Sequence, residues 1–205
     1  MLFWLLSVVL LIAGYPVFLN IAKNALFAYL CVNKPVPNGQ VLIVEGWLFD
    51  GLLPDVTQEF KNNNYDYILV SWQPRGIGPN DGGHVARKLL ALGIDSSRIK
   101  IAKVHPEVEH NTLAMALGVK KWLSENDPAV TRVNICTAGA HGKKTWVAYK
   151  RALGKSFTVG IFSYTRNRIP VSRWWKESSG GLRYIMLRWI GAIDAAWWPL
   201  SWVGN

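Results

Sequence analysis

From Val41 onward the sequence alternates short apolar segments with longer amphipathic ones, and this alternation limits the fold more than any other feature. The apolar segments have the length and continuous hydrophobicity of buried strands, while the others repeat apolar residues at the i, i+3 and i+4 spacing of helices. Strands that alternate with helices form a mainly parallel sheet with helices on both faces. The strands predicted are 41–47, 65–72, 98–104, 132–139 and 157–164. The helices predicted between them are 54–62, 82–93, 111–126 and 143–154.

The amino-terminal stretch is apolar and uncharged, and Lys23 is the first charged residue. About 20 apolar residues in a helix span the hydrocarbon core of a bilayer. A cleaved signal peptide would carry positive charge before the apolar part and a small-x-small motif after it, and neither is evident here. The sequence therefore predicts a transmembrane anchor over 1–23, with Trp4 in contact with lipid, followed by a juxtamembrane linker over 24–40.

The net charge of +10 and the 11 tryptophans indicate what a partner would be. A basic surface suits nucleic acid, anionic lipid or a phosphate-bearing ligand. Tryptophan favours the membrane–water boundary, which points to lipid. The chain has no helix-turn-helix spacing, RNP-type aromatic motif or zinc-knuckle cysteines, so we expect no nucleic acid.

The carboxyl-terminal segment 171–205 is rich in tryptophan. Asp194 lies in its middle, which makes it too polar for a second span, so we expect a helix in the membrane interface or packed on a partner's transmembrane helices. The alternative is a final helix that covers the sheet. The residues predicted to contact membrane or partner in this segment are Trp189, Trp197, Trp198 and Trp202.

Ligands of parallel α/β sheets bind beyond the carboxyl ends of the strands. Glu45 follows the first strand, where a buried carboxylate can serve as a base or pair with Arg75 or a lysine. His141 follows the fourth strand at a helix start, where it can act as acid or base or donate to a phosphate. Glu45 and His141 are therefore the candidate catalytic residues. The alternative for His141 is a helix cap or a loop hydrogen bond.

The same loops supply candidate ligand-binding residues. Lys143 and Lys144 would hold an anion at the helix start, and the alternative for both is a solvated helix face. The full set of candidate ligand-binding residues is Gly46, Trp47, Asn111, Thr112, Thr137, Lys143 and Lys144. A capping role is the alternative for Asn111 and Thr112. The histidines lack an HxxxH-type spacing, so we expect neither a metal nor a cofactor.

Several stretches together resemble the YdcF-like family, which includes the SanA and ElyC envelope proteins. They are "VEGW" at 44–47, "ALGI" before the third strand, "NT" at 111–112, "TAGAHGKKTWVAYKRALG" at 137–154 and "SRWWKESSGGLRYIM" near the end. The resemblance covers about residues 40 to 165. It implies a Rossmann-like α/β fold, which we assign to residues 41–170, frequently on a bacterial membrane anchor and with envelope or cell-wall roles.

The chain departs from the family pattern at several polar positions. Members commonly have paired glycines after the second strand, where this chain has Ser71-Trp72, and an acidic residue at the next helix start, where it has Gly83 or His84. The family's "NTxEN" lacks its Glu and Asn here, because Ala114 and Met115 replace them. General acid–base chemistry and metal binding need several groups that converge on one point. The departures therefore predict a depleted site.

These observations support two hypotheses of different kinds. The first is a non-catalytic accessory or scaffold subunit that docks to other integral membrane proteins of a bacterial membrane complex. The second is a cell-envelope enzyme that uses Glu45 and His141 on a phosphate-bearing or lipid-linked sugar substrate. Ligand binding without turnover lies between them. The lysines after the span favour a cytoplasmic domain by the positive-inside bias, whereas the anchored relatives suggest the periplasm. We expect a single-pass protein of the bacterial inner membrane with a periplasmic domain.

Overall fold

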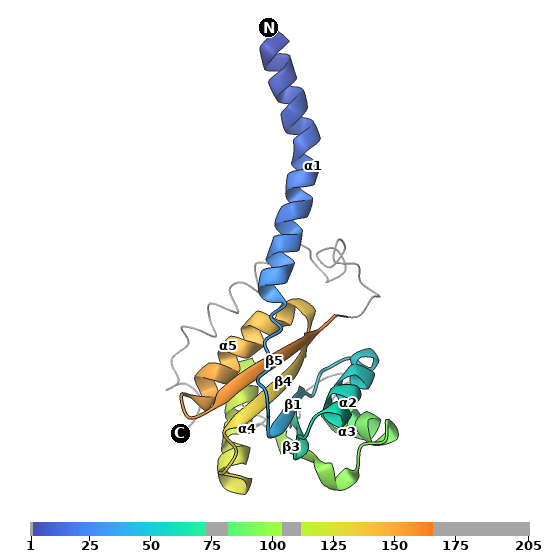
Figure 1. Cartoon of the computed structure of the whole chain (residues 1–205), viewed down its shortest axis with the longest axis vertical. Coiled ribbons are helices and arrows are strands. Elements are labelled where there is room, and N and C mark those ends of the chain that lie inside the picture. Colours follow the sequence, from blue (N-terminus) through green and yellow to red (C-terminus); the bar gives the residue numbers. More distant parts are fainter. Residues whose placement is uncertain (1, 73–81, 104–111, 166–205) are drawn as a thin grey trace.

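A computed structural model describes residues 2–72, 82–103 and 112–165, with side chains from residue 14 onward (Figure 1). The helices are α1 (Leu2–Leu30), α2 (Leu53–Asn62), α3 (Gly82–Ala91), α4 (Thr112–Asn126) and α5 (Gly142–Leu153). The strands are β1 (Val41–Glu45), β2 (Tyr67–Trp72), β3 (Ile99–Lys103), β4 (Arg132–Ala138) and β5 (Thr158–Tyr164). Short 3-10 turns are η1 (Asp50–Leu52), η2 (Ser96–Arg98) and η3 (Gly139–His141).

The five strands form one parallel sheet in the order β3-β2-β1-β4-β5, which confirms the predicted α/β, Rossmann-like architecture. Each connection along the chain passes through a helix, as parallel pairing requires. The strand order reverses between β1 and β4, because the chain moves outward from β1 to β3 and then returns to the other side of β1. Sheets of this kind bind ligands at that reversal, next to the carboxyl ends of the strands.

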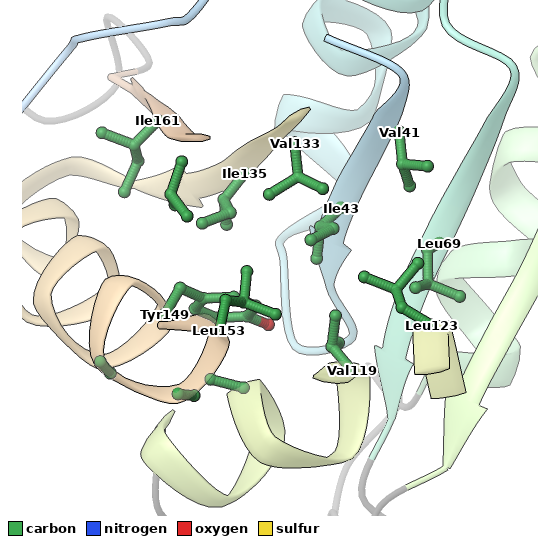
Figure 2. Close-up of a cluster of buried hydrophobic side chains, with 14 of the residues drawn as sticks. Val41, Ile43, Leu69, Val119, Leu123, Val133, Ile135, Tyr149, Leu153 and Ile161 are labelled. Carbon is green, nitrogen blue, oxygen red and sulfur yellow. The ribbon is translucent and has the colours of Figure 1, made fainter. Parts of the chain in front are cut away.

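Alternate residues of each strand enter two separate apolar cores. Ile43, Leu69 and Ile135 face α4 and α5, where Tyr149 and Leu153 lie (Figure 2). The adjacent strand residues face α2 and α3 in the second core. Because successive strand side chains point to opposite faces, a single strand sequence supplies both cores and reads as an unbroken apolar run.

Helix α1 continues to Leu30, beyond the boundary predicted at residue 23. Its last turns pack on η3, where Leu30 is 1% exposed and lies against Ala140. Figure 1 shows α1 rising from the end of the domain at which α5 begins. Within the residues whose side chains are described, we find no helix with the length and apolar character needed to cross a membrane.

The connection from α1 to β1 closes one edge of the sheet. Lys34 pairs with Ile161 of β5 in an antiparallel bridge, with Lys34 N donating to Ile161 O over 2.9 Å. The side chain of Asn134 then accepts from Val36 N at 2.8 Å and donates to Val36 O at 2.9 Å. The segment predicted as a linker is therefore bound to the domain from Lys34 to Val36.

Some predicted contact residues lie outside the described parts of the chain. They are Asn111, the side chain of Trp4, and the segment 171–205 with Trp189, Trp197, Trp198 and Trp202.

Candidate functional site

A row of polar side chains crosses the carboxyl end of the sheet on the face covered by α4 and α5. Glu45 of β1 pairs in register with Ser71 of β2, and Thr137 of β4 pairs with Ser163 of β5. Each residue follows an apolar core residue of its strand by two positions, so all four point to the same face. Ser71, Glu45 and Thr137 are fully buried, and Ser163 is 9% exposed. The row therefore caps the apolar core with polar groups at the point where the strand order reverses.

The carboxylate of Glu45 is held by hydroxyl groups from two other elements. Thr137 Oγ1 of β4 donates to Glu45 Oε2. Thr145 Oγ1 of α5 lies 3.3 Å from both carboxylate oxygens and donates between them. Burial of a charged group is tolerated when such hydrogen bonds replace its water. Glu45 therefore ties β1 to β4 and to α5.

Gly46 allows the turn that follows Glu45. Its backbone N–H donates to Ser71 O over 2.8 Å, and an added Cβ would collide with that same carbonyl oxygen. Such close approach of two backbones admits only glycine. Gly46 therefore has a structural role, because it lets the chain turn directly after Glu45.

His141 lies at the start of α5 and is buried, with 8% exposure. Its Nε2 lies 4.0 Å from Glu45 Oε1 and 3.4 Å from Thr112 Oγ1 of α4. The side chain makes no capping hydrogen bond to α5, so the capping alternative is wrong for it. Its Nδ1 is buried without a hydrogen-bond partner among the residues described. The imidazole therefore joins the starts of α4 and α5 to the Glu45 carboxylate.

Trp47 covers His141 with an apolar surface. The two ring centroids are 4.8 Å apart at an interplanar angle of 81°, the edge-to-face geometry that aromatic pairs favour. Ala114 and Met115 of α4 are buried against the same indole. The side chains that replace the Glu and Asn of the "NTxEN" pattern therefore form an apolar contact next to the histidine.

Two further buried hydroxyls lie close to Glu45. Neither Ser71 Oγ nor Tyr149 Oη has a hydrogen-bond partner of normal geometry in the described parts of the chain. Burial raises the pKa of the Tyr149 hydroxyl, the nearby Glu45 carboxylate raises it further, and Ser71 opposes the rise. Tyr149 is thus held neutral, because its anion would lie in an apolar core beside a carboxylate.

The two predicted lysines lie on the first turn of α5, and Lys143 turns toward aromatic rings. Its Nζ lies 4.8 Å from the centroid of the Tyr29 ring of α1 and 5.8 Å from that of Trp146. Lys143 and Lys144 are both half-buried. Lys143 therefore contacts the base of α1 and belongs to a different surface from the Glu45 carboxylate.

The structure thus brings several of the predicted site residues together around Glu45, and other residues that were not predicted lie beside them. Of the predicted residues, Glu45, Trp47, Thr112, Thr137 and His141 come together. Ser71, Thr145 and Tyr149 were not predicted, although two of them carry a signal in the sequence. Ser71 follows its apolar strand as Glu45 and Thr137 do, and Thr145 lies one helical turn after His141. Comparisons with protein-family models, with curated proteins and with solved structures find no match to this chain.

Proposed function

We propose that this chain is a membrane-anchored α/β domain that acts as a non-catalytic accessory subunit of a bacterial inner-membrane complex. The observation that carries the proposal is the closed state of Glu45, which is fully buried and accepts hydrogen bonds from Thr137 and Thr145. A reactive carboxylate must reach a substrate proton or a substrate atom. A carboxylate bound on both oxygens by its own chain serves better as a structural tie.

The surroundings of His141 support the same proposal. Trp47 packs edge-on against its ring, and Ala114 and Met115 pack on Trp47, with exposures of only 2% and 9%. Catalysis needs several polar groups at one point, and this side of the histidine presents apolar ones. This apolar packing around His141 suits a domain that binds partner proteins without catalysing a reaction.

The surface of α1 supports membrane anchoring. Tyr15, Val17, Phe18 and Ile21 are each more than 60% exposed, and no charged residue precedes Lys23. Large apolar side chains exposed in this density are stable in lipid or against other apolar helices. We place the helix in the bacterial inner membrane and the domain in the periplasm.

One observation favours the enzyme as a second candidate. His141 Nδ1 is buried without a hydrogen-bond partner among the residues described, and the buried hydroxyls of Ser71 and Tyr149, close to Glu45, have no partner of normal geometry there. Buried polar groups are costly when unpaired and are often kept for a ligand. A phosphate-bearing or lipid-linked sugar substrate would supply acceptors for such donors.

Extraction from native membranes in mild detergent separates the two candidates. An accessory subunit migrates in a large stoichiometric assembly, and both Glu45→Gln and His141→Ala still assemble and still complement a deletion strain. A Trp197→Ala, Trp198→Ala double variant, which leaves Glu45, Thr137, Thr145 and His141 unchanged, loses the assembly. A chain that migrates alone, together with a folded His141→Ala protein that fails to complement, would reverse the assignment in favour of the enzyme.

A further inference from the structure

Three lysines surround one tryptophan on the outer side of α5. The ammonium nitrogens of Lys34, Lys143 and Lys150 lie 5.5, 5.8 and 4.6 Å from the centroid of the Trp146 ring. They come from different parts of the chain, since Lys34 follows α1 and the other two lie on α5. The indole is fixed by its Nε1, which donates to Val159 O over 3.0 Å. We call these four residues, together with Tyr29, the Trp146 cluster.

The cluster gathers positive charge in a part of the chain that has no carboxylates. Residues 1–44 and 128–165 contain no Asp or Glu at all. Lys34 and Lys150 are exposed, so their charges reach the solvent. Contact with an aromatic face offsets only part of the repulsion among three ammonium groups, because each exposed contact contributes about 0.5–1 kcal/mol. An external anion with several negative charges would reduce the repulsion among these ammonium groups.

The position of the cluster indicates where that anion lies. Lys143 stacks on Tyr29, which is in the last turns of α1, and Leu30 one residue later packs on η3. The uncharged stretch of α1 ends at Lys23. Seven residues of helix from Lys23 to Leu30 span about 10 Å. On each side of a bilayer, the layer of headgroups and interface is about 5–8 Å thick. The cluster therefore begins at about the outer boundary of the headgroup layer when α1 is inserted.

We propose that the Trp146 cluster docks on the anionic headgroups of the membrane that holds α1. This inference rests on the membrane anchoring in the proposed function. Docking brings the base of α1 and the outer side of α5 near the bilayer, because the cluster extends from Tyr29 of α1 along α5 to Lys150 (Figure 1).

Lysine reactivity tests the docking within the intact chain. The full chain is placed in nanodiscs of neutral phosphatidylcholine or of phosphatidylcholine with phosphatidylglycerol, and acylation of each lysine is followed by mass spectrometry. Lys34, Lys143 and Lys150 should be modified about fivefold more slowly in the anionic discs, as expected for a lysine at an anionic surface. Lys100, Lys120 and Lys121, exposed on β3 and α4, serve as internal controls and should change less than about twofold.

A matched pair of variants tests whether the cluster acts together. Lys143→Ala with Lys150→Ala should abolish the protection of Lys34 in anionic discs, whereas Lys120→Ala with Lys121→Ala should leave it unchanged. Both variants remove two positive charges, so a difference between them reports position and not net charge. Loss of the Lys34 protection in both variants would overturn the docking surface.

The remaining outcomes name other occupants. Equal reactivity of the cluster lysines in the two kinds of disc overturns the proposal. Protection by inorganic phosphate in neutral discs, as strong as that by anionic lipid, assigns the cluster to a free anion. Protection seen only in the native assembly assigns it to an acidic partner protein. A chain that does not enter discs of either composition refutes the anchoring itself, and is thereby distinguished from an inserted chain whose lysines stay reactive.

Discussion

The domain divides into two parts that share the same cores and differ in surface charge. The balanced half comprises residues 45–72, 82–103 and 112–127, and the acid-free half comprises 14–44 and 128–165. The acids of the balanced half are Glu45, Asp50, Asp55, Glu59, Asp66, Asp95, Glu125 and Asp127. Its bases are Lys61, Arg87, Lys88, Arg98, Lys100, Lys103, Lys120 and Lys121. The bases of the acid-free half are Lys23, Lys34, Arg132, Lys143, Lys144, Lys150, Arg151 and Lys155, and it has no acids.

Folding does not require this difference. Leu69 of the balanced half and Ile135 of the acid-free half lie in the same apolar core, and Val70 and Cys136 lie together in the other. Surface charge contributes little to the choice of fold but strongly to what a surface attracts. The acid-free half also carries α1, so the excess of basic residues and the apolar helix occur together. The comparison teaches that the excess of basic residues lies on the half of the chain that carries the apolar helix, and that the shared cores do not account for this arrangement.

The largest expected difference in stability is between a substitution in the acid-free half and a substitution in the balanced half. Leu30→Asp puts a charge at a position that is 1% exposed, where α1 packs on η3, and should lower the free energy of unfolding by about 3 kcal/mol or more. Leu90→Asp on α3, at a position 42% exposed, should cost less than about 1 kcal/mol. Urea unfolding in detergent micelles, followed by circular dichroism, measures both. Similar costs for the two variants would show that α1 is not part of the folded unit.

The sequence was sufficient for the fold because its signals were local. The predicted helix at 143–154 and the observed α5 at Gly142–Leu153 differ by one residue at each end, and the strand at 132–139 ends one residue late. Glu45 and His141 were predicted because a polar residue at or shortly after the end of a buried strand is conspicuous in an apolar context. Periodicity and chain order carry this information without any knowledge of tertiary contacts.

The rest depends on which elements become neighbours. Nothing in the local pattern places Lys34 beside Trp146. The antiparallel bridge brings Lys34 to Ile161 of β5, and Trp146 donates to Val159 O of the same strand. The hydrogen bond from Thr145 to Glu45 likewise requires the first turn of α5, which follows β4, to lie beside the end of β1, and β1 and β4 become neighbours only in the folded sheet. Transmembrane insertion of α1 remains a prediction, since it concerns the surroundings of the chain.

Substitution of one threonine in each half should give a stability difference of intermediate size. Thr145→Val in α5 removes a hydroxyl that donates to the buried Glu45 carboxylate, so it should lower the free energy of unfolding by about 1–3 kcal/mol. Thr57→Val in α2 replaces a buried hydroxyl that has no hydrogen-bond partner among the described residues, so it should be neutral or stabilising by up to about 1 kcal/mol. Urea midpoints at neutral pH measure both. A destabilising Thr57→Val would mean that its hydroxyl is paired in solution.

The smallest expected effect concerns how the free energy of unfolding falls at acidic pH. Asp50 lies 2.6 Å from His84 Nε2 and 3.1 Å from Lys88 Nζ. The contact with His84, followed by that with Lys88, holds the pKa of the Asp50 carboxyl below its ordinary value. The unfolded chain therefore binds the proton more tightly than the folded chain. Stability from this group is complete above the unfolded pKa and is lost as the pH falls through the folded one.

Lys88→Ala should raise the pKa of Asp50 toward its ordinary value and so flatten the loss of stability below about pH 4. The change should be well under 1 kcal/mol, roughly the upper limit for exposed ion pairs. Lys150→Ala in the acid-free half removes the same charge from a lysine whose described contact is the Trp146 ring, so it should shift the profile without changing its slope. Urea midpoints measured from about pH 2.5 to 6 distinguish the two outcomes. An equal change of slope in both variants would indicate that net charge, rather than the Asp50 contact, governs the acid limb, and the two halves would then differ less than their contacts suggest.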